Sequence, residues 1–324
     1  MPMTIHYLVT GGAGFIGSHI VRRLIAEGAA VRVVDNLSTG QLDRLKDLRE
    51  SIEFIEGDLA DVRLSDEVAG GVECVFHQAA VPSVQRSVRD PIATNRANVT
   101  ATLNLLESCR RAGVRRFVYA ASSSAYGDTE VLPKSEAMSP NPLSPYALQK
   151  LVGERYCGLY HDLYGLETVS LRYFNVFGPD QDPYSQYSAV IPKFISALSA
   201  KEPITVFGDG EQSRDFTYVD NVVEANLLAS RVGDAPGKVF NIGCGKRISL
   251  NKLIQLLECI LGVKSTVIYA EARSGDVRHS LADIALGRRI LGYSPKIMVE
   301  EGLRNTVKAM EAKSEETRTT KPAT

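Results

Sequence analysis

A glycine-rich turn near the N-terminus is the feature that most constrains the fold. Residues 10–17 read Thr-Gly-Gly-Ala-Gly-Phe-Ile-Gly, and they join an apolar run at 5–9 to a segment with helical apolar spacing. In such a turn Gly11 permits a tight bend, Gly14 lets the backbone approach a pyrophosphate, and Gly17 lets the helix pack closely on the strand. The unpaired N–H groups at the start of the helix favour an anion. The motif therefore predicts a dinucleotide site.

An acidic residue at the end of the next apolar run specifies the dinucleotide. The run at 31–34 ends in Asp35, and no arginine follows directly. A carboxylate there can accept hydrogen bonds from both ribose hydroxyls and would repel a 2′-phosphate, so the predicted cofactor is NAD rather than NADP. Asp58, after the third apolar run, is placed to meet the adenine edge. The predicted cofactor contacts in this region are Gly11, Gly14, Phe15, Ile16, Gly17, Asp35, Asn36, Ser38, Thr39, Gly40, Asp58 and Leu59.

Short apolar runs alternate with helical segments through the first half of the chain. This alternation predicts an α/β fold with a doubly wound parallel sheet (a Rossmann fold), because helices must cover both faces of such a sheet. The expected strands are 5–9, 30–34, 52–55, 74–76, 117–119 and 168–172. After about residue 175 the pattern becomes irregular, which predicts a smaller α/β lobe for the substrate. The predicted units are 1–174 with returning segments at about 213–243, a lobe of 175–212 and 244–311, and a disordered tail of 312–324.

A tyrosine and a lysine at helical spacing form the candidate catalytic group. Residues 144–150 read Ser-Pro-Tyr-Ala-Leu-Gln-Lys, in which a serine cap and a proline at the first position begin a helix. Tyr146 and Lys150 then lie one turn apart on one face. A free phenol has a pKa of about 10, and a neighbouring ammonium and a positive nicotinamide ring would lower it. At the end of an upstream strand, Ser122, Ser123 and Ser124 offer hydroxyls to share the proton.

Composition limits the partners and the compartment. The 37 basic and 38 acidic residues give a formal net charge of -1, so no global field attracts nucleic acid or an anionic membrane. The 5 cysteines include no CxxC pair, which favours a reducing compartment. No signal peptide and no membrane-spanning apolar run is evident. The sequence therefore predicts a cytoplasmic protein with no nucleic-acid or membrane partner and no metal site.

These motifs together resemble the extended short-chain dehydrogenase/reductase family from Thr10 to about Gly302. Within it they look most like the UDP-hexose 4-epimerases, above all the branch acting on UDP-N-acetylglucosamine (UDP-GlcNAc) and UDP-N-acetylgalactosamine (UDP-GalNAc). Besides the motifs above, the resemblance is carried by 77–80, Asn98, 119–127, 171–175, 190–193, 207–210, 213–216 and 275–280.

The resemblance implies a role for each matching residue. Tyr146 matches the family's base, Ser122 its catalytic serine or threonine, and Lys150 the residue that binds the nicotinamide ribose. Ala121 departs from the family, because many relatives carry serine there, so the division of labour among the three serines stays open. Further implied cofactor contacts are Gln78, Ala79, Ala80, Asn98 and Tyr173. The implied substrate contacts are Ser83, Ser122, Asn175, Gln181, Ala189, Val190, Ile191, Lys193, Thr205, Val206, Phe207, Arg214, Arg273, Asp276 and Ser280.

The implied activity is inversion of carbon 4 of a UDP-sugar through a transient 4-keto intermediate. Ser280 stands where a bulky aromatic marks enzymes for plain hexoses, so serine predicts room for an acetamido group and favours UDP-GlcNAc over UDP-glucose. A uronic-acid 4-epimerase stays open. A 4,6-dehydratase needs an acid pair where this chain has Ser123 and Ser124. A catalytically inactive, NAD-sensing binding protein is the alternative from another class.

Relatives commonly pair through two helices of each subunit, so a homodimer is also implied. The corresponding segments here are 98–112 and 145–163. Leu105, Leu106, Tyr156 and Tyr160 fit such a contact and fit core packing equally well.

Overall fold

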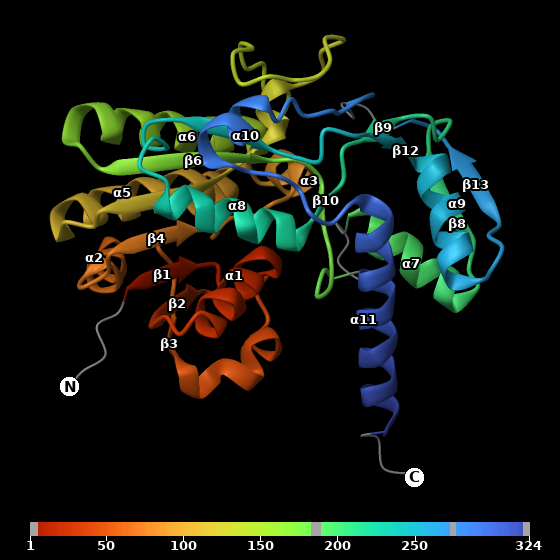
Figure 1. The fold of residues 1–324 in the computed structure, drawn as a ribbon, viewed down its shortest axis with the longest axis horizontal. Coiled ribbons are helices and arrows are strands. Elements are labelled where there is room, and N and C mark those ends of the chain that lie inside the picture. The colour runs from red at the N-terminus through yellow and green to blue at the C-terminus, as the bar shows by residue number, and fades with distance from the viewer. Residues whose placement is uncertain (1–5, 183–188, 273–276, 320–324) are drawn as a thin grey trace.

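A seven-stranded parallel sheet forms the centre of the molecule (Figure 1). The computed structural model describes residues 6–182, 189–272 and 277–319. All neighbouring strands pair in parallel, in the order β11-β6-β5-β4-β1-β2-β3. The strands are β1 (Tyr7–Thr10), β2 (Val31–Asp35), β3 (Ile52–Glu56), β4 (Cys74–His77), β5 (Arg116–Ser122), β6 (Glu167–Tyr173) and β11 (Val239–Ile242).

The predicted doubly wound fold is confirmed. Each of the six expected runs contributes a strand, and residues 239–242 return to the sheet as β11. From β1 the chain moves outward through β2 and β3, then crosses to β4 on the other side of β1. The strand order therefore reverses between β1 and β4, which is where ligands bind at the carboxyl ends of such sheets.

Helices cover both faces of the sheet. On one face α1 (Phe15–Ala26) and α8 (Val219–Arg231) pack in a core that includes Ile20 and Val222. On the other, α2 (Val62–Ala69), α5 (Ala101–Ala112) and α6 (Pro145–Tyr164) pack around Leu105 and Phe117. Shorter elements connect these layers: η1 (Leu42–Ser51), α3 (Val84–Arg89), α4 (Pro91–Asn95), η2 (Arg96–Thr100), η3 (Ser123–Tyr126) and α10 (Ala285–Leu291).

A second, smaller lobe lies beside the sheet, to the right in Figure 1. Its core joins α7, α9 and α11 around Ile195, Leu253 and Leu303. Three two-stranded sheets accompany them, pairing β7 with β10, β9 with β12 and β8 with β13. The elements are β7 (Val176–Phe177), α7 (Val190–Ala200), β8 (Ile204–Phe207), β9 (Ser213–Arg214), β10 (Thr217–Tyr218), β12 (Ile248–Ser249), α9 (Leu250–Leu261), β13 (Val267–Ala270) and α11 (Val299–Thr319).

The structure departs from the predicted unit boundaries in three places. Residues 213–218 pair within the small sheets rather than joining the central one. Ile284, Leu291 and Tyr293, which the sequence assigned to the lobe, pack in the core of the central sheet because their apolar side chains cover β11. α11 continues to Thr319, although the sequence predicted a disordered tail from 312. No helix of the described residues is long and apolar enough to cross a membrane.

Candidate active site

The glycine turn has the geometry that its sequence predicts. Gly11 has a φ of +64°, and a Cβ there would stand 2.7 Å from the backbone nitrogen of Ala79. A Cβ on Gly14 would stand 2.9 Å from the Gly11 carbonyl oxygen, and one on Gly17 would collide with the same oxygen. The turn is therefore packed against its own backbone and the β4 exit, and only glycine leaves the start of α1 open to a ligand.

Asp35 closes this end of the site. It ends β2, and its carboxylate accepts hydrogen bonds from the Ala13 amide at 3.0 Å and the Leu37 amide at 2.9 Å. Burial raises the pKa of Asp35, while these two amides act in the opposite direction. The carboxylate is held against the glycine turn and lines a cavity of about 930 Å³. An open glycine cradle beside a fixed acceptor fits the pyrophosphate and ribose of NAD.

Helix α6 begins as predicted and places Lys150 beneath the cleft. The Ser144 hydroxyl caps the helix by accepting from the Ala147 amide at 3.2 Å. The Lys150 ammonium donates to the Ala120 carbonyl oxygen at 2.8 Å and lies 5.0 Å from the centre of the Tyr119 ring. Burial lowers the pKa of Lys150 to about 8. Its charge is thus kept in a dry position one turn from Tyr146.

A directed chain of hydroxyls leads to Tyr146. The Ser124 hydroxyl donates to the Ser122 oxygen at 2.8 Å, which also accepts from the Ser124 amide at 3.2 Å. Ser122 in turn acts to lower the pKa of the Tyr146 phenol. Burial nevertheless dominates and raises the pKa of Tyr146, so the predicted lowering by Lys150 is not what the protein groups produce. The reason is that burial removes the water that would stabilise the charged phenolate.

Most of the predicted site residues line the larger cavity, which runs from the glycine turn to the second lobe. They come from the ends of the central strands and from segments between the sheet and the lobe. They are Gly11, Gly14, Phe15, Ile16, Gly17, Asp35, Asn36, Ser38, Thr39, Gly40, Asp58, Leu59, Gln78, Ala79, Ala80, Ser83, Ser122, Ser123, Ser124, Tyr146, Lys150, Tyr173, Asn175, Gln181, Ala189, Arg214 and Ser280.

Asn98 lies behind the wall of the cavity rather than on it. It is 1% exposed on η2, and its side-chain oxygen accepts from the Val81 amide at 2.8 Å. Its amide group donates to Gln149 at 2.9 Å. The Asn98 side chain thus fixes the segment after β4, because both ends of its amide are bonded within the protein, and its role as a cofactor contact stays a prediction.

The predicted nucleotide contacts on β8 and α7 also need correction. Thr205 is exposed, Val206 is buried in the core of the lobe, and Phe207 ends the strand. Lys193 is half-buried on α7. None of these four residues lines the two cavities described in this section. On β8 the side chains alternate between the lobe core and the surface. Arg273 and Asp276 lie outside the described residues.

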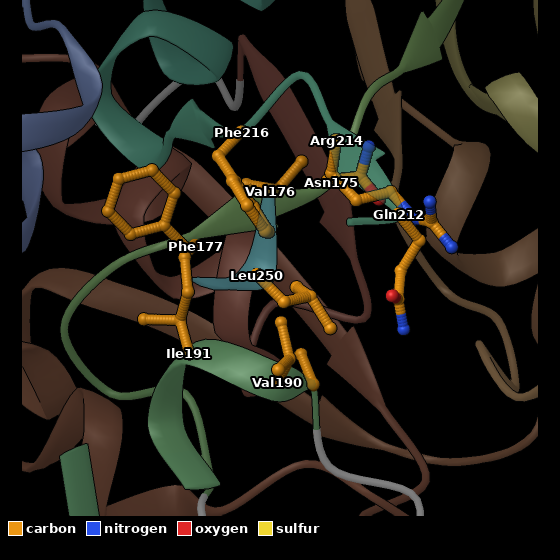
Figure 2. A pocket seen from close by; sticks show the side chains of 10 residues that line it. Asn175, Val176, Phe177, Val190, Ile191, Gln212, Arg214, Phe216 and Leu250 are labelled. Carbon is orange, nitrogen blue, oxygen red and sulfur yellow. The ribbon is translucent and has the colours of Figure 1, made fainter. Parts of the chain in front are cut away.

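A smaller pocket of about 250 Å³ adjoins the main cavity (Figure 2). Asn175, Ala189 and Arg214 line both cavities, so the two are continuous. In Figure 2, apolar side chains lie on one side of the pocket, and Asn175, Gln212 and Arg214 lie on the other. Such a slot fits a flat base whose attached phosphates extend toward Arg214. Its lining residues are Asn175, Val176, Phe177, Ala189, Val190, Ile191, Gln212, Arg214, Phe216 and Leu250.

Several residues that line the two cavities could not be identified from the sequence. Gln212, Phe216 and Leu250 line the smaller pocket, and Arg44 and Lys134 line the main cavity. The Arg44 guanidinium donates to the Ala13 carbonyl oxygen at 3.0 Å. It thus supports the glycine turn, although it lies 31 residues later in the chain. No local motif marks these positions, because their place depends on how distant segments pair.

The sheet order, the glycine turn with Asp35, and the Ser122–Tyr146–Lys150 group in one cleft define a dinucleotide-binding protein of the extended short-chain dehydrogenase/reductase class. Residues 7–243 match the NAD dependent epimerase/dehydratase family, and the chain belongs to this family. Its cofactor is NAD.

Similar proteins extend over almost the whole chain. A putative UDP-glucose 4-epimerase of Methanocaldococcus jannaschii is 41% identical over 305 residues, covering 94% of this chain and 97% of that protein. The structure of a UDP-glucose 4-epimerase from Thermotoga maritima with UDP-glucose has a TM-score of 0.91 at 40% identity, covering 95% and 99% of the two chains. A UDP-N-acetylglucosamine 4-epimerase from Methanobrevibacter ruminantium, in complex with UDP-N-acetylmuramic acid, also has a TM-score of 0.91 at 40% identity, covering 96% and 99%.

Proposed function

We propose that this protein is an NAD-dependent 4-epimerase of UDP-sugars that interconverts UDP-GlcNAc and UDP-GalNAc, with UDP-glucose and UDP-galactose as a second pair. The observation that carries the proposal is that Ser122, Tyr146 and Lys150 line the same cavity as the glycine turn, and that this cavity continues into a smaller pocket beside Arg214. The names of the similar proteins support the same activity.

The proposed chemistry depends on where protons are held. NAD, when bound, supplies reversible hydride transfer at carbon 4 of the sugar. The Tyr146 oxygen takes the proton of the 4-hydroxyl and later returns it. The Ser124 hydroxyl donates to Ser122, and Ser122 acts to lower the pKa of Tyr146, so the two serines favour the phenolate form that accepts the proton. Lys150 adds a positive charge one turn away, and Arg214 holds the diphosphate while the 4-keto sugar turns over.

The proposed sugar preference rests on Ser280. Ser280 is 7% exposed and lines the main cavity, and its backbone N–H donates to the Ser213 carbonyl oxygen at 3.0 Å. A small side chain on a fixed backbone leaves room for an acetamido group at carbon 2. Ser123 and Ser124 line the same cavity and supply no acid for the loss of water, which disfavours a dehydratase.

We also propose a homodimer, formed through α6 of each subunit. Leu105 and Leu106 of α5 are both 0% exposed in the core, so they are not available for a partner. α6 instead exposes Leu148, Leu159 and Leu163 at 51%, 51% and 66%. Light scattering of the wild type and of Leu159→Glu tests this proposal, with a monomeric wild type as the contrary result.

The test of the activity is an assay on purified protein without added NAD. UDP-GlcNAc, UDP-glucose and UDP-glucuronate are each incubated, and the products are separated by chromatography. We expect UDP-GalNAc from UDP-GlcNAc at the highest rate, and a loss of about 100-fold or more in Tyr146→Phe, because the base is removed. Tyr164→Phe, at an exposed tyrosine of the same helix, is the matched control. No turnover of any UDP-sugar by the wild type would refute the proposal.

A further inference from the structure

Lys134 is a buried lysine in the segment between η3 and α6. Lys134 is 2% exposed. Its backbone is fixed on both sides: its N–H donates to the Leu281 carbonyl oxygen at 2.8 Å, and its own carbonyl oxygen accepts from the Asp283 amide at 2.9 Å. Asn241 donates to the same carbonyl oxygen at 2.8 Å. The Lys134 side chain therefore starts from a fixed backbone, where this segment pairs with the stretch that follows Ser280 through a bridge between Lys134 and Ala282.

The Lys134 ammonium has few partners for a buried charge. It donates to the Gly127 carbonyl oxygen at 2.7 Å, and no carboxylate of the described residues forms an ion pair with it. Burial lowers the pKa of Lys134; Asp128 acts against this shift, and Arg214 adds to it. An ammonium has three donors, and buried lysines are normally paired. Most of the hydrogen-bonding capacity of this group is unused within the described chain.

A purely structural role does not account for the residue. One hydrogen bond offsets only a small part of the free energy that it costs to bury an unpaired ion. An apolar side chain of the same length would fill the same space without that cost. A buried cation with free donors at a cavity wall is instead typical of a ligand-binding position.

The position of Lys134 shows which part of a ligand it would meet. It lines the main cavity together with Ser124, Ser280 and Arg214. It is joined to the turn after Ser124 through Gly127 and to the stretch after Ser280 through Leu281. It thus belongs to the sugar end of the cleft, away from the glycine turn and Asp35.

We propose that Lys134 is a substrate-binding residue whose ammonium donates to an anionic oxygen of the nucleotide-sugar. This inference rests on the proposed function. Two sources offer such an oxygen: the phosphate next to the sugar, close to Arg214, and a carboxylate at carbon 6 when the sugar is a uronic acid. A lysine suits either oxygen because it is a compact point charge with rotatable donors.

The test measures binding to the NAD-loaded protein by titration calorimetry. UMP, UDP, UDP-glucose and UDP-glucuronate are compared on the wild type, Lys134→Met and Lys134→Gln, in which the amide can still donate to Gly127. Loss of a charge-assisted hydrogen bond predicts affinity about 10- to 100-fold lower. Lys264→Met, whose lysine side chain is 92% exposed, is the matched control and should bind as the wild type does.

The pattern across ligands identifies the contact. If the ammonium meets the phosphate, UDP, UDP-glucose and UDP-glucuronate all lose affinity in both variants and UMP does not. If it meets the carboxylate, only UDP-glucuronate loses affinity. Unchanged binding of all four ligands overturns the inference, and so does an equal loss for UMP together with a lower melting temperature of the ligand-free protein. A wild type that binds no UDP-sugar would instead refute the proposed function.

Discussion

Replacing Lys150 by methionine is expected to stabilise the NAD-free protein while it removes most of the activity. Lys150 is 4% exposed, and burial lowers its pKa from 10.5 to about 8. Because each pKa unit corresponds to about 1.4 kcal/mol, keeping the charged form in the folded protein costs about 3 kcal/mol. Methionine removes that cost but loses a hydrogen bond to Ala120 worth about 1 kcal/mol. The free energy of unfolding should therefore rise by about 1 to 3 kcal/mol.

The pH dependence gives this prediction a definite sign. In the unfolded chain a lysine keeps its proton up to a pKa of about 10.4. In the folded protein Lys150 releases it above about pH 8. The unfolded state thus binds more protons in this window, and the wild type gains stability relative to Lys150→Met as the pH rises. The difference in unfolding free energy that favours the variant is largest below about pH 8 and becomes smaller toward pH 10.

Urea denaturation of NAD-free proteins at a series of pH values measures this difference. Subtracting the unfolding free energy of the variant from that of the wild type removes the contribution of the buried tyrosines, because both proteins share it. Lys264→Met should differ from the wild type by less than about 0.5 kcal/mol, because its lysine is on the surface. A Lys150→Met protein less stable than the wild type at neutral pH, or a difference that does not change with pH, would show that the buried ammonium carries no such cost.

Two other substitutions test the sugar pocket and the core beneath it. Ser280→Tyr should lower kcat/KM for UDP-GlcNAc relative to UDP-glucose by about 10- to 200-fold, because the ring occupies the acetamido space; an equal loss on both sugars would contradict this. Glu154→Gln should lower the unfolding free energy by about 3 to 5 kcal/mol, because it leaves the Arg172 guanidinium buried without a charge partner. The pair is 3% exposed on both sides, with two hydrogen bonds of 2.7 Å. Glu300→Gln, at an exposed ion pair, should change it by less than about 1 kcal/mol, and a similar effect of both variants would refute the argument.

The parts of this molecule that could be predicted from sequence are those fixed by local rules. A buried parallel strand reads as a continuous apolar run because both its faces are covered, and all the expected runs became strands. The glycine turn and the Tyr146–Lys150 spacing depend only on residues within a few positions of each other. Helix α6 likewise starts where Ser144 and Pro145 specify it.

The features that the sequence did not reveal depend on tertiary pairing. Asn98 was assigned to the cofactor, but its partners Val81 and Gln149 are brought to it by the packing of α6 on η2. Gln212 enters the base pocket because β9 turns beside β12 in a two-stranded sheet that no sequence pattern announces. Lys134 looks like a loop lysine in the sequence, and only its pairing with the stretch after Ser280 buries it.

The distribution of charge in the cleft follows from the same pairing. The whole chain has a formal net charge of -1, yet more cationic than anionic side chains line the main cavity. They comprise the cations Arg44, Arg86, Lys134, Lys150 and Arg214 and the anions Asp35, Asp58 and Asp182. Asp35 ends β2 and Asp58 follows β3, on the side of the glycine turn, whereas Lys134 comes from the segment before α6, Lys150 from α6 and Arg214 from β9. Apart from Arg44, which is bound to the glycine turn, acceptors thus stand where we propose that ribose hydroxyls bind, and cations where we propose that the diphosphate binds. An overall charge count conceals this separation, because a cleft built from distant segments concentrates charges that cancel in the sum.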